Sequence, residues 1–205
     1  SFNGFVDLGV LDLNGLPINY VGPYYLEGKD YSSQDWFKEI QKKGFYISEV
    51  FLGFRNVPHL IIAAKYALPD GSFYVLRAAL DTSRFNELLR DFELSGRGDA
   101  FLINREGVIQ TPTLYHNQVF EKIPYTVPEY SDHTEILEEK NTTGEDVIIC
   151  SAYIPDSPYI LVIVKEKDEL MKPWRQTRFQ LIIFLIISIS VILLAILGFS
   201  TYMVN

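Results

Sequence analysis

The chain has 205 residues, and its 26 acidic and 18 basic side chains give a formal net charge of −8. A chain with this acidic balance lacks the clustered Lys and Arg that contact phosphates, so we expect no nucleic-acid partner. The single cysteine, Cys150, excludes an intrachain disulfide and a four-cysteine zinc site. The charged part of the sequence is long enough for one medium hydrophobic core or two small ones.

The first predicted elements are a hairpin and an amphipathic helix. The hairpin covers Leu11–Ile18, and Gly15 supplies the positive φ that its turn requires. Ser32 or Ser33 is a suitable N-cap for a helix that runs to about Lys43. Three residues form the apolar face of this helix: Trp36, Phe37 and Ile40.

Two strands and a second helix are predicted next. The runs Ile61–Tyr66 and Phe73–Leu80 are rich in β-forming residues and are joined by a Pro-Asp turn. Asp81, or one of the two hydroxyl residues after it, can cap a helix that runs to about Phe92.

Both hairpins recur later in the chain. The turn at Gly15 has a counterpart at Gly107, and the Pro-Asp turn at Pro69 has one at Pro155, with offsets of 92 and 86 residues. Strand, turn and strand in the same order predict two copies of one α/β module. In the second copy we expect a helix over Asp132–Lys140.

The last predicted element is a membrane-spanning helix. The 24 residues of Leu181–Val204 include no Asp, Glu, Lys or Arg. A helix crosses the bilayer core with roughly 20 apolar residues, and a span in lipid must be helical to satisfy its backbone. We therefore expect a transmembrane helix over 181–204 and a juxtamembrane helix over 169–180, which Pro173 starts or kinks.

No motif in the sequence indicates catalysis. There is no G-x-S-x-G motif, no phosphate-binding loop and no dinucleotide-binding fingerprint. The three histidines, His59, His116 and His133, do not have the spacing of a metal site. We therefore predict no catalytic residue, no metal and no cofactor in this chain.

Four segments of the sequence carry a family resemblance: Asp30–Phe37, Tyr46–Ser48, Tyr74–Asp81, and Gly96–Asn104 together with Gly107. With these segments in this order, the sequence resembles the double-Cache sensor domain, the tandem PAS-like ectodomain of many bacterial receptors. The resemblance covers residues 2–165, nearly all of the part before the membrane helix.

The resemblance implies an α+β fold: two tandem PAS-like modules with antiparallel sheets, followed by one transmembrane helix. Residues 1–94 would form a membrane-distal module that binds a small ligand. Residues 95–168 would form a membrane-proximal module that relays the signal. Members of this family usually have a stalk helix and a first membrane helix before this region. A cytoplasmic output domain usually follows it, so we expect the chain to belong to a longer, homodimeric receptor.

One segment departs from the pattern of the amino-acid-binding members. Those members carry an Arg two residues before the Trp of the helix motif, where it binds the ligand carboxylate, but this chain has Gln34. Phe37 stands where a Tyr is usual, whereas Asp81 matches the Asp that pairs with a ligand amine. The resemblance therefore implies a ligand that is not a typical α-amino acid and that is amine-bearing or uncharged.

Seven residues are candidates for ligand binding. Trp36 combines an apolar body with an N–H donor, which suits a pocket wall, and core packing is an equal alternative. Asp81 is a ligand acceptor, a helix N-cap or both. Arg55 and His59 bracket the loop between two strands, where they either reach the rim of the pocket or are solvated. The complete set is Tyr31, Trp36, Phe37, Tyr46, Arg55, His59 and Asp81.

These inferences predict an extracytoplasmic small-molecule sensor anchored in the inner membrane. Ser1–Phe179 would lie outside the cytoplasm and the C-terminal end inside it. The expected output domain is a histidine kinase, with a chemoreceptor signalling domain or a diguanylate cyclase as alternatives. A ligand-free structural or protein-interaction ectodomain is the alternative from a different class.

Overall fold

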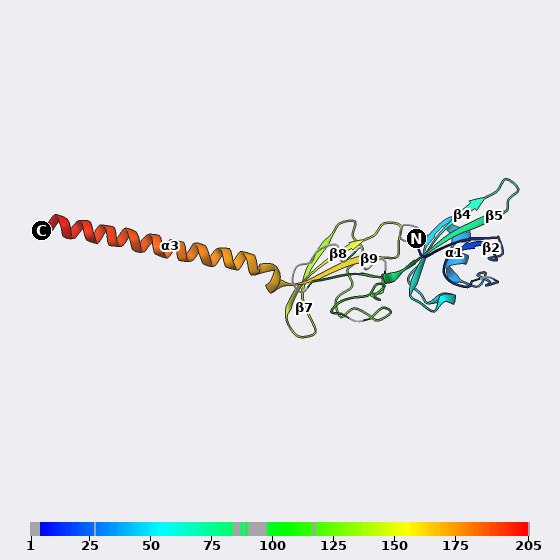
Figure 1. Cartoon of the computed structure of the whole chain (residues 1–205), viewed down its shortest axis with the longest axis horizontal. Coiled ribbons are helices and arrows are strands. Elements are labelled where there is room, and N and C mark those ends of the chain that lie inside the picture. The colour runs from blue at the N-terminus through cyan, green and yellow to red at the C-terminus, as the bar shows by residue number, and fades with distance from the viewer. Residues whose placement is uncertain are drawn as a thin grey trace. The chain divides into compact units, whose positions relative to one another are not determined.

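The computed structural model describes residues 5–26, 28–83, 87, 89, 98–116 and 118–204. Figure 1 shows the described elements, coloured from blue to red along the chain. In chain order they are β1 (Asp7–Leu11), β2 (Pro17–Val21), α1 (Asp35–Lys43), β3 (Phe45–Ile47), the 3-10 turn η1 (Gly53–Arg55), β4 (His59–Ala67), β5 (Phe73–Asp81), β6 (Gly98–Ile103), β7 (Glu135–Lys140), β8 (Asp146–Tyr153), β9 (Ile160–Glu166) and α3 (Lys167–Val204).

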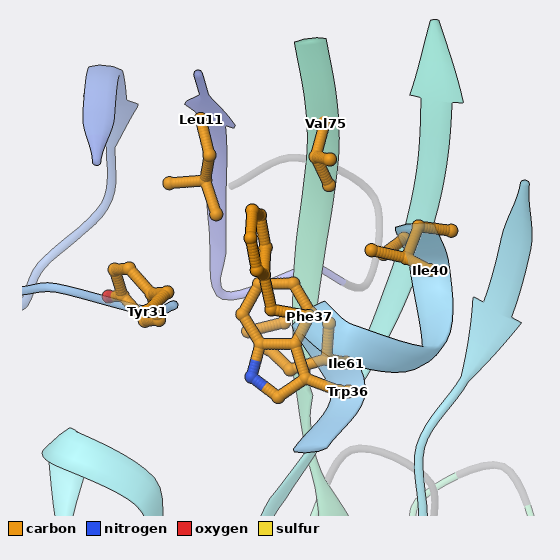
Figure 2. Packing of buried hydrophobic residues seen from close by; sticks show 9 residues of the cluster. Leu11, Tyr31, Trp36, Phe37, Ile40, Ile61 and Val75 are labelled. Carbon is orange, nitrogen blue, oxygen red and sulfur yellow. The ribbon is translucent and has the colours of Figure 1, made fainter. Parts of the chain in front are cut away.

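The first sheet has five antiparallel strands in the order β2-β1-β5-β4-β3, and α1 packs against one of its faces. Figure 2 shows Phe37 of α1 between Leu11 of β1 and Val75 of β5, with Ile61 of β4 beneath Trp36. All of these side chains are buried in one cluster. The apolar face predicted for the helix is therefore the face that closes the core of this sheet.

The predicted cap of α1 is wrong. The N-cap is Gln34, which makes no side-chain capping bond, and its carbonyl accepts from the backbone N–H groups of Phe37 and Lys38. Ser32 instead belongs to a turn before the helix, where its N–H donates to Asp30 Oδ1 at 2.8 Å. An aspartate that accepts from the backbone two residues later competes with helix formation, so the helix begins after this turn.

The second sheet has four strands in the order β6-β9-β8-β7 and its own buried cluster, which includes Phe101, Ile109 and Ile160. The helix predicted over Asp132–Lys140 is wrong, because Glu135–Lys140 forms strand β7, paired antiparallel with β8. Its Glu and Leu residues favour a helix locally, but strand pairing overrides that preference. The charged β7 is an edge strand, a position where charges discourage pairing with other chains.

Three hairpin turns of the two sheets are built alike. Asp12 Oδ1 accepts from the backbone N–H groups two and four residues later, at 2.9 and 2.8 Å. The side-chain oxygens of Asn104 and Asn141 accept from the same relative positions. Gly15, Gly107 and Gly144 then take φ values of 78° to 87°. The glycine turns predicted from the sequence are present at the first two sites. The third turn joins β7 to β8.

A third buried cluster lies where the two sheets meet, and it includes Leu60 of β4, Leu102 of β6 and Tyr159. The Tyr159 hydroxyl donates to the carbonyl oxygen of Ser48 at 2.5 Å, and the N–H of Val50 donates to Gln110 Oε1 at 2.7 Å. The same short segment also pairs with the first sheet, because Ser48 N donates to the Ile61 carbonyl and Phe51 N to that of His59. Segment 48–51 is thus bonded to both sheets.

Residues 1–165, with both sheets, form one compact unit, and residues 166–205 form another. The predicted boundary at residue 94 falls outside the described residues, so the division into two modules stays a prediction. Of the helix predicted to run to Phe92, Thr82, Ser83, Glu87 and Leu89 are helical and the rest lies outside the described part.

The C-terminal unit is a single helix, α3, that begins at Lys167, directly after β9, and contains Pro173. The described residues include one helix long and apolar enough to cross a membrane, and none of its most apolar stretch is buried. The predicted fold class is confirmed: an α+β protein with antiparallel sheets and an apolar C-terminal helix.

Candidate functional site

The strand register of the first sheet brings polar side chains onto the face that α1 covers. Successive strand residues point to opposite faces, so Asp7 and Gly9 of β1 share a face, as do Arg77 and Asp81 of β5. Gly9 lies opposite Arg77 and His59 opposite Asp81 in the ladder. These charged residues therefore enter the core side of the sheet at one end of α1.

The charged residues form a buried ion cluster. Arg55 Nη1 donates to Asp7 Oδ2 at 2.9 Å, and Arg77 Nη2 donates to Asp7 Oδ1 at 3.1 Å. The second terminal nitrogen of Arg55 donates to Asp81. The side chains of Asp7 and Arg55 are 0% and 1% exposed, against 17% for Asp81. Two arginines and two aspartates balance in charge, which is the condition under which such groups tolerate burial.

Glycine makes room for this cluster. A Cβ at Gly9 would lie 3.1 Å from Arg77 Nε and 3.4 Å from its Cγ. At these distances the Arg77 side chain would have to shift by a few tenths of an ångström, so a larger residue at this position would disturb its placement. The absence of a side chain at Gly9 is part of what positions the guanidinium group.

Aromatic rings cover the cluster. The guanidinium of Arg77 lies 5.0 Å from the ring centre of Tyr31, and that of Arg55 lies 4.5 Å from the ring of Tyr24. Tyr31 in turn contacts Trp36 at 5.7 Å and Phe54 at 5.3 Å between ring centres. Stacking of guanidinium groups on aromatic faces is favourable, and more so when water is excluded.

A small cavity of about 10 Å³ lies between these rings and the sheet. Its walls are formed by α1 and the segment before it, by η1 and by β4 and β5. The lining includes Tyr31, Gln34, Trp36, Phe54, Arg55, His59 and Arg77. A volume of this size holds about one water molecule. The site is therefore closed by its own aromatic side chains.

Two polar atoms in the lining are buried and lack a hydrogen-bond partner among the described residues. They are the Tyr31 hydroxyl and Arg55 Nε. A buried polar group without a partner costs roughly 1–3 kcal/mol, so native proteins rarely leave one in place without a reason. Both atoms belong to side chains that line the same cavity.

The environment shifts two ionisation equilibria. Burial raises the pKa of the Tyr31 hydroxyl, so this group is a neutral donor and acceptor at neutral pH. Burial, with the positive charges of Arg55 and Arg77, lowers the pKa of His59 below its ordinary value of 6.5, although Asp81 and the Val57 carbonyl oppose this shift. His59 Nδ1 lies 2.7 Å from the Val57 carbonyl oxygen, so Nδ1 carries the hydrogen of the neutral ring.

The neutral state of His59 predicts that stability falls in mild acid. In the unfolded chain the histidine takes up a proton near its ordinary pKa of 6.5, but in the folded chain it does so only at lower pH. Stability is complete above the unfolded pKa and is lost as the pH falls from there toward the folded pKa. We expect the melting temperature to be lower at pH 5.5 than at pH 7.5, and His59→Gln to reduce that difference.

The comparison isolates His59, because the variant keeps the other two histidines, His116 and His133. The melting temperature could instead change as much between the two pH values in His59→Gln as in the parent chain. That result would contradict the role of His59 in the loss of stability.

The structure brings together five of the seven candidate residues. Tyr31, Trp36, Arg55 and His59 all line the cavity. Asp81 joins them through its bond to Arg55. Arg55, on η1, and His59, on β4, are both buried rather than exposed on a loop surface.

The other two candidates lie elsewhere. Phe37 is in the hydrophobic core beside Trp36 and does not line the cavity. Tyr46, on β3, faces a wider cleft of about 850 Å³, whose lining also includes Arg105 and Tyr153 of the second sheet. That cleft is open to solvent, so its polar groups can be hydrated and do not need a ligand.

Four residues of the site were not identified from the sequence: Asp7, Tyr24, Phe54 and Arg77. Asp7 and Arg77 could have been identified from the sequence, because each is a charged residue inside a run that otherwise predicts a buried strand. Tyr24 and Phe54 lie outside the strands, and no local pattern marks them. Among the described residues, no group of three potential metal-binding side chains is close enough to hold a metal ion.

The fold and this pocket define an α+β protein of the PAS-like class, with a helix over an antiparallel sheet and a buried polar site between them. Residues 1–174 match the family described as Cache domain, and the chain belongs to that family. No curated protein sequence matches the chain.

Solved structures share the fold at low sequence identity. The ligand-binding domain of the amino-acid chemoreceptor PctB of Pseudomonas aeruginosa PAO1, in complex with L-Arg, has a TM-score of 0.67 and 16% identity over 87% of this chain and 72% of that one. The extracellular domain of the predicted histidine kinase rpHK1S-Z16 has a TM-score of 0.62 and 15% identity, with coverages of 80% and 71%. The ligand-binding domain of the Pseudomonas fluorescens chemoreceptor CtaA with L-isoleucine has a TM-score of 0.60 and 17% identity, with coverages of 83% and 72%.

These neighbours are extracellular or ligand-binding domains of signalling proteins. Together with the family and the apolar α3, they indicate a membrane-anchored receptor with an extracytoplasmic sensor domain.

Proposed function

We propose that this chain is the sensing region of a transmembrane receptor in the inner membrane and that it binds a small molecule in the pocket beneath Trp36. The observation that carries the proposal is the buried cluster of Asp7, Arg55, Arg77 and Asp81, beside a cavity where two polar atoms lack a partner among the described residues. A cluster kept only for stability would be expected to satisfy all of its polar groups.

The ligand in this proposal is not a typical α-amino acid. Gln34 lines the cavity at the position where the amino-acid-binding members of the family carry the carboxylate-binding Arg. Asp81, the candidate partner of a ligand amine, is already held by Arg55. The structural neighbours PctB and CtaA bind amino acids, so L-Arg and L-isoleucine are the natural comparison ligands for a test.

In this proposal, the effect of ligand binding is transmitted toward the membrane through segment 48–51 and β9. Phe51 and Gly53 line the cavity, and segment 48–51 is bonded to the second sheet at Tyr159 and Gln110. Tyr159 immediately precedes β9, which leads without a loop into α3. A ligand that favours one arrangement of this segment would bias the helix, which is the requirement for transmission.

The proposed output is a histidine kinase, in a receptor that acts as a homodimer. The similarity to the extracellular domains of rpHK1S-Z16 and mmHK1S-Z3 supports a kinase. The similarity to PctB and CtaA supports a chemoreceptor as the alternative.

A ligand-free interaction ectodomain is the second candidate function. The observation that favours it is the volume of the cavity, which at about 10 Å³ has no room for an organic molecule unless the aromatic cover moves. A ligand screen separates the two candidates.

The screen measures thermal unfolding of the full chain in detergent with a library of small metabolites, including the comparison amino acids. A ligand that binds the folded state at 100 times its Kd stabilises it by about 2.7 kcal/mol. We expect at least one compound to raise the melting temperature, and Trp36→Phe to reduce that rise. Trp174→Phe is the matched control, because this exposed tryptophan lies on α3.

Two outcomes would contradict the proposal. If no compound stabilises the chain, the ligand-free ectodomain is favoured. If a compound stabilises Trp36→Phe and the parent chain equally, its binding site is not the pocket beneath Trp36.

A further inference from the structure

The two unpartnered atoms of the cavity specify the chemistry that would complete it. Arg55 is almost entirely buried, with 1% of its side chain exposed, and Tyr31 is 5% exposed. Neither Arg55 Nε nor the Tyr31 hydroxyl has a partner in the described part of the chain. Both residues line the same cavity, so one group placed there could reach both.

A guanidinium nitrogen can only donate, so Arg55 Nε requires an acceptor. Both oxygens of Asp7 already accept from Arg55 and Arg77, and Asp81 accepts from the far end of the Arg55 guanidinium. The other polar lining residues carry both donors and acceptors, since Gln34 and Trp36 have N–H groups, while Gln34 Oε1 and the unprotonated Nε2 of His59 can accept. Arg55 Nε remains the buried donor that has no acceptor among the described residues.

An ammonium group does not supply what Arg55 Nε lacks. It carries three donors and no acceptor, so it cannot bond to Arg55 Nε. The aspartates that could pair with it, Asp7 and Asp81, are already bonded to the two arginines. A ligand oxygen, in contrast, would satisfy Arg55 Nε and Tyr31 together. A carboxylate makes the stronger bond, because a guanidinium–carboxylate bond is charge-assisted.

Resting on the proposed function, we propose that the pocket beneath Trp36 takes a small carboxylic acid without an ammonium group. One carboxylate oxygen accepts from Arg55 Nε and from the Tyr31 hydroxyl. Arg55, on η1, would thus recognise the acid in place of the residue at the N-cap of α1, where this chain has Gln34.

Binding requires the aromatic cover to open. Phe54 is the part of the cover that can move, because it is 43% exposed and contacts Tyr31 edge to face. It follows Gly53, which has a left-handed φ of 51° and is packed between Phe51 and His59. Outward rotation of the Phe54 ring would enlarge the cavity without disturbing the ion cluster beneath it.

The test uses isothermal titration of the full chain in lipid nanodiscs with four probes of similar size. Lactate carries a carboxylate and a hydroxyl group, lactamide replaces the carboxylate by a neutral amide, L-alanine replaces the hydroxyl by an ammonium group, and isopropylamine has only the amine. We expect lactate to bind most tightly, lactamide more weakly, and L-alanine and isopropylamine not detectably.

Tyr31→Phe separates recognition from folding. It removes the hydroxyl and keeps the ring on Arg77 and Trp36. We expect lactate affinity to fall by about ten-fold or more, as for the loss of a hydrogen bond to a charged group. The melting temperature without ligand should stay the same or rise, since the hydroxyl has no partner in the described chain. Tyr46→Phe, at the separate cleft, is the matched control and should leave lactate affinity unchanged.

Each other outcome overturns the inference. If L-alanine or isopropylamine binds as tightly as lactate, or if Tyr31→Phe leaves lactate binding unchanged, the acid is not recognised as proposed, while the sensor function stands. If lactate does not bind but another compound of the screen does and loses affinity in Trp36→Phe, the ligand class is wrong and the pocket is right. If no compound binds at all, a water molecule satisfies the two atoms, and both the inference and the proposed function fail.

Discussion

Replacing Asp7 by alanine is expected to lower the free energy of unfolding by about 3–5 kcal/mol. Asp7 is the common acceptor for Arg55 and Arg77, and its side chain is fully buried. Its removal leaves two guanidinium groups in the core with one remaining aspartate, Asp81, which is bonded to Arg55. Breaking a buried ion pair from one side is costly for this reason, even where the intact pair contributes little. Urea unfolding of the full chain in mild detergent, followed by the fluorescence of Trp36, measures the change.

Asp146→Ala is the matched control for this experiment. Asp146 pairs with Lys140 at 2.7 Å, but both side chains are more than half exposed. Water solvates both charges when an exposed pair of this kind is broken, so the expected loss is about 0–1 kcal/mol. If Asp7→Ala costs no more than Asp146→Ala, the charged cluster is not a buried network in solution. The geometry of the candidate site would then have to be revised.

Much of the fold could be predicted because its signals are local. The apolar spacing of Trp36, Phe37 and Ile40 defines the buried face of α1, and the Asp12–Gly15 and Asn104–Gly107 turns carry the residue types that their geometry requires. The apolar run of α3 needs no knowledge of the rest of the chain. Each of these signals lies within about a dozen residues, where sequence patterns are informative.

The wrong N-cap of α1 is a local error, caused by the turn at Asp30, but the other errors occurred where pairing between strands decides the structure. β7 became a strand because β8 lies beside it and a turn at Asn141 joins them, although its Glu and Leu content favours a helix. Asp7 and Arg77 were missed from the sequence because their positions also depend on strand pairing. Asp7 and Arg77 are 70 positions apart and meet only because β1 pairs with β5 in one particular register. A slip of one residue would place them on opposite faces, and composition alone does not set that register.

The site also shows why a residue's type did not reveal its role. Arg55 and Asp81 were both recognised as candidates, one as a rim residue and the other as an acceptor for a ligand amine. In the structure they are bonded to each other. This bond uses one oxygen of Asp81 and one terminal nitrogen of Arg55, and the buried donor that it leaves for a ligand is Arg55 Nε. Hydrogen-bond capacity can be counted only once the partners are known.

Phe37→Ala is expected to destabilise the chain by about 3–5 kcal/mol. The Phe37 ring is 1% exposed and lies in the centre of the cluster formed by α1 and the first sheet, edge to face with Trp36. Its removal would create a cavity that Leu11, Val75 and Ile61 surround (Figure 2), and strands fixed in a sheet cannot close it. Urea unfolding measured as for Asp7 gives the loss.

Phe45→Ala is the control that makes this result informative, because Phe45 lies on β3 of the same sheet and is half exposed. Its ring is in contact with water already, so we expect a loss below about 1 kcal/mol. Phe37 was a candidate ligand contact from the sequence, and the two roles give opposite results. If Phe37 contacted a ligand on a pocket wall, Phe37→Ala would lower the affinity for that ligand and leave the stability of the chain unchanged. If Phe37→Ala unfolds at the same urea concentration as Phe45→Ala, the ring is not a core residue in solution, and the pocket extends beneath α1.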